Sequence, residues 1–482
     1  MPHSITVLPA NQTVNAAGGD SLLSVLRSAG FIVDAPCGGD GRCGKCRVLL
    51  KGKEVLACRT VVDRDMTVTL PEIGDRQILT EGIVSAGGPP SPGSGYSLAF
   101  DIGTTTVVGY LLADSKVLAS ASAGNPQAAY GADVVSRIRL AVQGQQDALT
   151  GCIRNCLQDL TLQLCRDGGI SPEQVSFVSV VGNPAMQQLF LNIPLENLAK
   201  VPFSPVLTEA KTVPAGDILP VLANARLLIV PDIAGFVGAD TVACVLATGM
   251  DTAEEMTLLV DIGTNGEMVL GNRNALVACS AAAGPALEGA GIHFGMRGQT
   301  GAIDHVWVEN GQMKCSVIGG GTAVGICGSG LIDGAAAALE LGYINERGKI
   351  LTSDGMIHLT EEVYLTQEDI RQLQLAKGAI AAGIRLMAAH LGIGLQEVPR
   401  VYLAGAFGTF MDPKSACRIG LLPAELEGKI TAAGNAAGSG AKLLACDPDT
   451  RARVQTIAAQ TQALELSTLP DFPKCFARNM RF

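Results

Sequence analysis

The sequence is poor in aromatic residues and in clustered charge. Phe, Trp and Tyr make up 4% of the 482 residues, and Trp occurs once, so the core must be built from small and aliphatic side chains. The formal net charge is −10 at pH 7, and Lys and Arg are scattered. Nucleic-acid surfaces need a clustered basic footprint. We therefore expect no nucleic-acid partner.

Segments that would insert into or cross a membrane are also missing. No uninterrupted apolar run reaches the roughly 18 residues of a membrane-spanning helix. The opening Met-Pro-His-Ser-Ile-Thr has no basic segment followed by an apolar core. We expect a cytoplasmic protein without a membrane partner, in which the 14 cysteines bind metal or fill cores instead of forming disulfides.

Several common catalytic motifs do not occur. The P-loop pattern G-x-x-x-x-G-K-[ST] is absent, and no glycine fingerprint stands in the strand–helix context of a Rossmann fold. The five His show no metal-ligand spacing, and no Ser-His-Asp or Cys-His nucleophile system is suggested. A nucleotide, if one binds, must therefore be held by another kind of site.

Four cysteines near the N-terminus have the spacing C-x5-C-x2-C-x11-C, and several glycines lie between the first three. Glycine lets a loop wrap closely around a cluster and direct N–H groups at its sulfurs. Four thiolates suit either a [2Fe-2S] cluster or structural zinc. The spacing is close to the plant-type ferredoxin pattern and unlike paired zinc knuckles, so it favours [2Fe-2S]. The predicted ligands are Cys37, Cys43, Cys46 and Cys58.

The residues around these cysteines predict a small mixed domain. We expect a hairpin from 4–8 and 12–16, a helix capped by Asp20 or Ser21, and strands at 47–50, near 55–57 and at 66–70. Hairpin, helix, metal loop and further strands within residues 1–75 resemble the β-grasp ferredoxins. Residues 76–97, rich in Gly, Ser and Pro, predict a linker, either a swing arm for an electron carrier or a passive connector.

Two similar hairpins follow the linker. An apolar strand leads into Asp-Ile-Gly-Thr at Asp101 and again at Asp261, and a second strand follows each turn. Turn N–H groups and hydroxyls suit phosphates, and an aspartate can hold Mg²⁺, usually through water. The predicted phosphate-binding residues are Gly103, Thr104, Thr105, Thr106, Gly263, Thr264 and Asn265.

Three further segments complete the pattern. A buried strand ends in the small-residue turn Gly405, Ala406, Phe407 and Gly408, which would let an adenosine lie against backbone. Residues 231–243 predict a helix that crosses closely against another at a hinge, with 435–444 as its partner. This ordered set, over about 97–450, resembles the acetate kinase, sugar kinase, Hsp70 and actin superfamily. The resemblance implies two RNase-H-like α/β subdomains with ATP in the cleft between them.

Single polar residues leave alternatives open. Glu267 follows the second turn and is our candidate to orient the attacking water, although a solvated strand residue is equally consistent. Asp232 and Asp240 flank the hinge helix, where helix capping is favoured over water positioning. Ser329, in a Gly-Ser-Gly stretch before an Ala-rich helix, suits nucleotide contact or capping equally.

The resemblance is narrowed by more local stretches, among them Ala-Ala-Gly-Pro-Ala-Leu-Glu-Gly at 282–289 and Gly-Ile-Cys-Gly-Ser-Gly at 325–330. Together with the cysteine loop they resemble the reductive activators of corrinoid proteins, over almost the whole chain. Longer members carry a small middle domain between ferredoxin and ATPase. Because residues 76–97 are too few for a domain, we expect that domain to be missing.

This resemblance implies an ATP-hydrolysing activase that reduces the inactive Co(II) corrinoid of a methyltransferase system to Co(I). It implies a [2Fe-2S] cluster, ATP and Mg²⁺ as cofactors, a corrinoid protein as partner, and an upstream low-potential reductant such as a ferredoxin or flavodoxin. Asp101, Asp261 and Glu267 would act in catalysis. We expect a ferredoxin domain at 1–75, a linker at 76–97, subdomain I at 98–245, and subdomain II at 246–482 with a C-terminal return to subdomain I.

Other functions remain possible on sequence grounds. A small-molecule kinase with a redox sensor would use the same ATP cleft, but phosphoryl transfer needs no electrons. An ATP-dependent electron donor to another low-potential enzyme usually carries a [4Fe-4S] cluster bridged between subunits. The four cysteines in one chain here argue against that function. An actin-like filament or chaperone would leave the cysteines unexplained.

Overall fold

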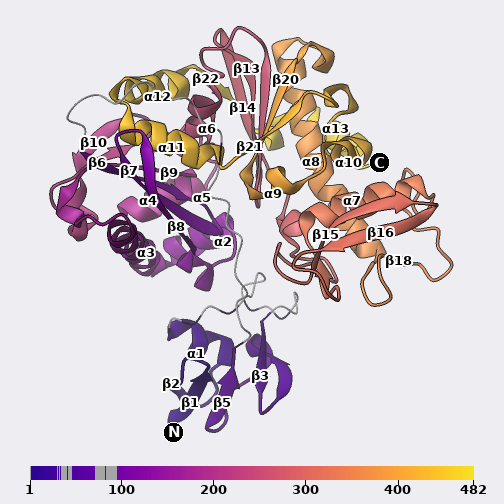
Figure 1. Cartoon of the computed structure of the whole chain (residues 1–482), viewed down its shortest axis with the longest axis horizontal. Helices are drawn as coiled ribbons and strands as arrows, with labels where there is room; N and C mark the ends of the chain where they lie inside the picture. Colours follow the sequence, from indigo (N-terminus) through magenta and orange to yellow (C-terminus); the bar gives the residue numbers. More distant parts are fainter. Residues whose placement is uncertain are drawn as a thin grey trace.

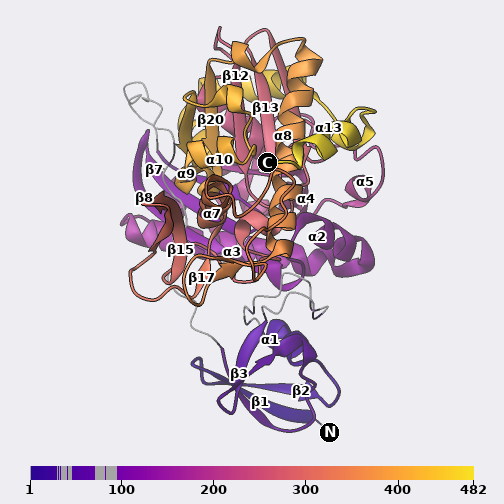
Figure 2. The ribbon, with the colours of Figure 1, turned by 90° about the vertical axis from the view of Figure 1, so that its right-hand side faces the viewer.

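The computed structural model describes residues 2–29, 31, 33, 39, 41, 46–70, 82 and 95–482 (Figure 1). Two of the four predicted cluster ligands, Cys37 and Cys43, lie outside these residues. Nearly all of the predicted linker also lies outside them. In the described parts, a small N-terminal sheet is drawn apart from two larger lobes (Figures 1 and 2).

The N-terminal sheet has five strands in the order β2-β1-β5-β3-β4. Strands β1 and β5 run parallel, and the other neighbouring pairs are antiparallel. This is the predicted β-grasp arrangement, and the strands lie within a residue or two of the predicted ranges. They are β1 (Pro2–Leu8), β2 (Gln12–Ala17), β3 (Arg47–Leu50), β4 (Lys53–Leu56) and β5 (Met66–Thr69).

Helix α1 (Leu22–Ser28) covers this sheet with the four apolar residues of its first turns, which are buried. Of the two candidate caps, Ser21 is the N-cap, because its hydroxyl accepts a hydrogen bond from the backbone N–H of Ser24. The carboxylate of Asp20 accepts instead from the N–H of Ala17, at the end of the hairpin.

Each lobe is built on a six-stranded sheet, in the order β10-β11-β9-β6-β7-β8 in the first and β21-β20-β12-β13-β14-β22 in the second. The strands of the first lobe are β6 (Tyr96–Ile102), β7 (Thr106–Ala113), β8 (Lys116–Gly124), β9 (Val175–Gly182), β10 (Lys211–Pro214) and β11 (Arg226–Ile229). Those of the second are β12 (Thr257–Ile262), β13 (Gly266–Asn272), β14 (Ala275–Ala281), β20 (Arg400–Ala404), β21 (Ile430–Gly434) and β22 (Thr461–Ala463).

The two sheets repeat one topology. Strands β6 and β12 each pair antiparallel with the strand that follows them, and each pairs parallel with a later strand on the other side. Asp101 and Asp261 therefore occupy equivalent places near the ends of central strands, opposite Val181 and Ala404 in the parallel neighbours. The predicted fold class, two RNase-H-like lobes after a ferredoxin domain, is confirmed.

Two helices cross between the sheets. Helices α6 (Ala239–Thr248) and α11 (Ala436–Cys446) approach so closely that a Cβ on Gly440 would lie 2.1 Å from the carbonyl oxygen of Ala243. The predicted crossing is confirmed, although α6 begins well inside the predicted 231–243 range. One apolar cluster, which includes residues of both sheets and both helices, joins the lobes into a continuous core.

Further helices pack around the sheets and against one another (Figures 1 and 2). In the first lobe these are α2 (Val134–Leu140), α3 (Gln146–Asp167), α4 (Pro184–Leu191) and α5 (Glu196–Ala199). The later part of the chain adds α7 (Gly328–Glu340), α8 (Gln367–Leu391), α9 (Gly405–Phe410), α10 (Pro413–Arg418), α12 (Pro448–Gln460) and α13 (Phe472–Asn479). None of the helices in the described ranges is long and apolar enough to cross a membrane.

A small subdomain is inserted in the second lobe. It has a three-stranded sheet in the order β16-β15-β17 and a two-stranded sheet of β18 and β19. Helix α7 packs against β15, so this subdomain forms one wall beside the central strands. Its strands are β15 (Ala302–Glu309), β16 (Gln312–Val317), β17 (Gly325–Ile326), β18 (Ile357–His358) and β19 (Tyr364–Leu365).

Candidate functional site

The first phosphate turn, between β6 and β7, is held from outside by three hydrogen bonds to its carbonyl groups. Asn125 donates its side-chain N–H to Gly103 O at 2.8 Å and its backbone N–H to Thr105 O at 2.9 Å. Arg137 donates from its guanidinium to Thr104 O at 2.6 Å. With the carbonyls so engaged, the turn can present N–H groups and hydroxyls to an anion.

The side chains of this turn line a cavity of about 650 Å³ between the lobes, together with those of the second turn. In the second turn the N–H of Gly263 donates to Asn265 O at 2.9 Å. Every residue of the two predicted phosphate turns lines the cavity: Gly103, Thr104, Thr105, Thr106, Gly263, Thr264 and Asn265. The fold therefore brings together two hairpins that are 160 residues apart in the sequence.

Six carboxylates line the same cavity: Asp101, Asp240, Asp261, Glu267, Glu288 and Asp304. Burial, together with the charges of Asp240 and Asp261, raises the pKa of Asp101 to about 7. Burial, with the charge of Asp261, also raises the pKa of Asp240 to about 7. The pKa of Asp261 is raised to about 6 and that of Glu267 to about 8, in both cases chiefly by burial. The cavity thus gathers carboxylates whose charged forms are disfavoured by burial and by one another.

Such a cluster fits a divalent cation, because a bound cation would relieve the repulsion that raises these pKa values. No three acidic, His or Cys side chains among the described residues are close enough to ligate one ion directly. Mg²⁺ keeps several waters and is often bound through one or two carboxylates and substrate phosphates. The residues present therefore fit a hydrated Mg²⁺ held with a nucleotide, with Asp101 and Asp261 at its protein side.

Glu267, for which sequence reasoning left two roles open, and Asp240, for which it favoured helix capping, both lie at the cavity. Glu267 faces the cavity from β13, and its carboxylate accepts a hydrogen bond from the Ser280 hydroxyl at 3.1 Å, so it is not a solvated strand residue. Asp240, for which capping was favoured, also lines the cavity. Asp232 does not line it; this buried carboxylate accepts from the side chain of Gln187, and burial raises its pKa well above the usual value.

The adenosine turn is placed at the end of β20, where α9 begins. Gly405 has φ +85°, and a Cβ there would lie 2.7 Å from an Asp261 carboxylate oxygen, so the position admits only glycine without a shift. Gly405 lines the cavity, whereas Gly408 packs against Leu403. The side chains of Ala406 and Phe407 lie outside what the structure describes. Gly328 and Ser329 also line the cavity, and the Ser329 hydroxyl donates to Asp304 O.

Two of the four cluster cysteines are described, and their surroundings fit a cluster. Cys46 is buried, and its sulfur accepts a hydrogen bond from the backbone N–H of Cys58 at 3.4 Å. Two glycines of the cysteine loop, Gly39 and Gly41, have positive φ. A Cβ on Gly39 would lie 3.9 Å from Cys58 Cβ, so the loop returns to this pair of cysteines. Backbone N–H groups near ligating sulfurs are typical of iron–sulfur sites.

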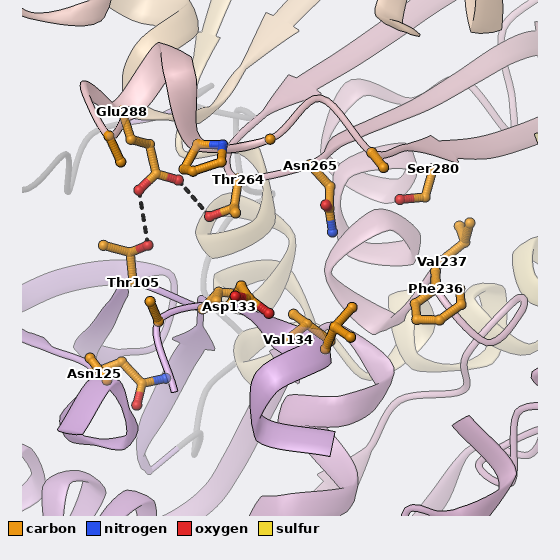
Figure 3. Close-up of a pocket in the computed structure, with 18 of the residues that line it drawn as sticks. Thr105, Asn125, Asp133, Val134, Phe236, Val237, Thr264, Asn265, Ser280 and Glu288 are labelled. Carbon is orange, nitrogen blue, oxygen red and sulfur yellow. Dashed lines mark hydrogen bonds between the residues drawn. The ribbon is translucent and has the colours of Figure 1, made fainter. Parts of the chain in front are cut away.

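A second, larger cavity of about 1100 Å³ adjoins the cavity lined by the two turns (Figure 3). Its walls are mostly apolar, with Phe236, Val237 and Val134 on one side. It shares Thr105, Thr264 and Glu288 with the first cavity. Nothing in the sequence pattern indicated this second space.

Sequence reasoning missed three residues that organise the site. Asn125 and Arg137 hold the first turn, and Glu288 bridges both turns. The available signals were slight: Asn125 stands at the end of a strand, and Glu288 belongs to a glycine-rich stretch already noted. No local pattern marked Arg137, which lies on a short helix between other Arg and apolar residues.

In comparison with known proteins, three family models match successive parts of the chain. Residues 5–68 match a model described as a 2Fe-2S iron-sulfur cluster binding domain. Residues 96–253 match the model of the "RACo middle region", and residues 255–482 match the "C-terminal domain of RACo the ASKHA domain". The region that this model calls the middle is the first lobe, after residues 76–97, so the expected lack of a separate small domain between the ferredoxin domain and the lobes stays a prediction.

Individual relatives span most of the chain. The corrinoid activation enzyme RamQ of Eubacterium limosum is 35% identical over 419 residues, which cover 80% of this chain and 70% of RamQ. The [Co(II) methylated amine-specific corrinoid protein] reductase of Methanosarcina barkeri is 29% identical over 68% of this chain and 66% of its own length. The chain thus spans about two thirds of these curated relatives.

A solved structure extends the likeness to the fold. The structure titled "Reductive activator for corrinoid,iron-sulfur protein" has a TM-score of 0.73 at 28% identity, covering 100% of this chain and 98% of that one. The ordered cysteines, the paired phosphate turns and these matches agree, and the chain belongs to the family of reductive activators of corrinoid proteins.

Proposed function

We propose that this protein is an ATP-dependent reductive activator that returns an inactive Co(II) corrinoid to Co(I) for a corrinoid-dependent methyltransferase system. The observation that carries the proposal is the fusion, in one chain, of a ferredoxin domain and a two-lobed cleft lined by six carboxylates and two phosphate turns. Phosphoryl transfer alone would not need a ferredoxin domain, and electron transfer alone would not need the two-lobed cleft.

We assign the nucleotide to the 650 Å³ cavity. Thr104, Thr105, Thr106, Thr264 and Asn265, with Gly103 and Gly263, would donate to its phosphates. The small-residue turn at 405–408 would lie against its adenosine. Asp101 and Asp261 would hold the water shell of Mg²⁺, and Glu267, held by Ser280, would orient the water that attacks.

The cluster, held by Cys37, Cys43, Cys46 and Cys58, supplies one electron when it is bound. The role of the ferredoxin residues is to hold the ligands and to direct the N–H of Cys58 at the Cys46 sulfur, an interaction of the kind that tunes cluster potential. We further propose the domain limits 1–75, 76–97, 98–245 and 246–482. Helix α11, which packs on β6 and β9, would be the return of subdomain II to subdomain I.

The energy needed is modest. Plant-type clusters have potentials near about −400 mV. Because about 59 mV corresponds to a tenfold change for one electron, an uphill gap of about 100 mV costs about 2.3 kcal/mol. A partner that binds one nucleotide state more tightly than another can supply that amount. The lobes, joined by crossing helices, are the element that would change state.

The partner would be a corrinoid protein, and a low-potential ferredoxin or flavodoxin would restore the electron. We propose a cytoplasmic location, which the free thiols among the described cysteines support.

The test is an anaerobic assay that follows Co(I) formation from the Co(II) corrinoid protein by its absorbance. We expect Co(I) to form only with ATP, Mg²⁺ and reductant, and to be lost in Cys43→Ala. Co(I) formation that is unaffected by this substitution or by omitting ATP would refute the proposal.

A further inference from the structure

The carboxylate of Glu288 bridges the two phosphate turns (Figure 3). Its Oε1 accepts a hydrogen bond from the Thr264 hydroxyl at 2.5 Å, and its Oε2 accepts one from the Thr105 hydroxyl at 3.3 Å. Thr105 belongs to the first lobe, and Thr264 belongs to the second. One side chain therefore links the lobes through the two hydroxyls that the proposed function assigns to phosphate.

A carboxylate and a phosphate compete for these hydroxyls. Both are anions that only accept hydrogen bonds when ionised, and each hydroxyl has a single proton to donate. Glu288 thus occupies the place of a phosphate oxygen between the turns. A phosphate that arrives there must displace it, and charge repulsion adds to the competition.

The location of Glu288 indicates which phosphate it meets. Among the described residues, Glu288 is the one acidic side chain that lines both the nucleotide cavity and the larger second cavity. The second cavity is not lined by Gly405, the first residue of the adenosine turn. Glu288 therefore stands at the phosphate end of the nucleotide cavity, where the terminal phosphate of ATP would extend farthest from the adenosine.

The side chain also has space to leave. It faces the 1100 Å³ cavity, and the cation Arg297 and the amide Gln299 lie where this cavity meets the first one, because both residues line both cavities. The backbone next to it is held more tightly, because Gly289 has φ +78° and a Cβ there would lie 2.6 Å from Met296 N and O. A rotation of the Glu288 side chain, without movement of its loop, would free both threonines.

We propose that Glu288 is the residue by which the cleft discriminates ATP from ADP. Its carboxylate bridges Thr105 and Thr264 when the terminal phosphate position is empty, as with ADP, and the γ-phosphate of ATP displaces it. Displacement replaces a direct contact between the lobes by contacts to the nucleotide. This inference rests on the proposed function, because it requires ATP in the cleft.

The test compares Glu288→Gln with the unsubstituted protein. Gln has the same shape, but its neutral amide holds the hydroxyls less strongly than a carboxylate does. Calorimetric titration with Mg²⁺ would give Kd values for ADP and for the non-hydrolysable β,γ-imido analogue of ATP. We expect Glu288→Gln to bind the analogue about tenfold more tightly, about 1.4 kcal/mol, and to bind ADP within about threefold of the original.

Glu465→Gln is the matched control. Glu465 lines the second cavity alone, and its carboxylate accepts from the Ser467 hydroxyl. We expect this variant to leave both affinities unchanged. Unfolding curves of both variants would verify that they fold.

The outcomes separate the two proposals. If the unsubstituted protein binds both nucleotides and Glu288→Gln leaves the ratio of their affinities unchanged while hydrolysis stops, Glu288 orients water and the inference is wrong. If the analogue binds more weakly to the variant, the carboxylate assists phosphate binding and the inference is also wrong. If the unsubstituted protein binds neither nucleotide, the proposed function itself fails.

Discussion

Arg137 is a buried cation placed directly behind the first phosphate turn, and its replacement by Met should uncouple that turn from its support. The side chain is fully buried on α2. It donates to Thr104 O at 2.6 Å, to Gly131 O at 2.8 Å and to the side-chain oxygen of Gln127 at 3.3 Å. The negative charge of Asp133 acts against the lowering of the Arg137 pKa, and the Asp133 carboxylate accepts a hydrogen bond from the backbone N–H of Ser136.

Two opposing contributions determine how much free energy of unfolding is lost in Arg137→Met. Hydrogen bonds to a charged donor contribute about 1.5–3 kcal/mol each, so three of them contribute about 4.5–9 kcal/mol. Against this, burial lowers the pKa of Arg137 from 12.5 to about 10, a cost of about 3 kcal/mol for the charged form. We therefore expect Arg137→Met to lower the free energy of unfolding by about 3 kcal/mol. That corresponds to a fall in Tm of about 6–12 °C for a lobe of this size.

Nucleotide affinity should fall for a separate reason. A unit charge about 10 Å from a phosphate contributes about 1.7 kcal/mol at an effective dielectric constant of 20. Loss of this attraction should weaken ADP binding by about tenfold or more. Arg137→Lys, which keeps the charge but cannot reach all three oxygens, should recover part of the affinity and little of the stability.

The assay combines thermal unfolding with calorimetric titration of ADP. Arg154→Met is the matched control, because Arg154 lies on α3 of the same lobe and donates to Phe190 O, away from the turn. We expect it to cost about 1–3 kcal/mol of stability without a change in affinity. If Arg137→Met unfolds at a lower temperature but binds ADP as before, the assigned role behind the phosphate is refuted.

Three further predictions concern other parts of the chain. Lys377 is buried on α8 and donates to the carbonyl oxygens of Asn479 and Arg481; burial lowers its pKa to about 7. Between pH 7 and about 10 the unfolded chain therefore binds more protons than the folded chain, so the free energy of unfolding should rise with pH across that window. Urea titrations should show this rise reduced in Lys377→Met. Cys46→Ser should abolish the low-temperature EPR signal of the reconstituted, reduced protein while ATP hydrolysis continues; an unchanged signal would exclude Cys46 as a ligand. Gly440→Val should lower Tm by about 10 °C or more or prevent folding, because its Cβ would lie 2.1 Å from a carbonyl of α6, and an unchanged melting curve would contradict the close crossing.

The fold of the ferredoxin domain and of the two hairpins could be predicted because their signals are local. Strands β1 to β5 coincide with short apolar runs in the sequence. Ser21 caps α1 by accepting a hydrogen bond from the backbone N–H of Ser24, only three residues later. Asp101 and Asp261 each follow an apolar strand and precede a tight turn, so their equivalence was visible without a structure. The crossing of α6 and α11 was visible in the same way, from small residues that allow two backbones to approach.

The boundaries of the hinge helix and the role of Asp240 could not be predicted as well. Helix α6 begins at Ala239, after residues that have the same small-residue composition as the helix itself. Composition alone does not show at which residue the loop ends and the helix begins. Asp240, in the first turn of that helix, has the position of an ordinary capping carboxylate, and only the placement of α6 against both sheets brings it to the cavity.

By itself, the sequence determined the cysteine spacing, the two Asp-Ile-Gly-Thr turns and the strands that carry them, because backbone geometry and hydrophobic pattern act over a few residues. Only the tertiary structure decided how the turns are held. Glu288 reaches Thr105 across 183 positions and Thr264 across 24, and Arg137 reaches Thr104 across 33. A long polar side chain can satisfy its hydrogen bonds with many partners, and the packing of two sheets on α6 and α11 selects which partner is near.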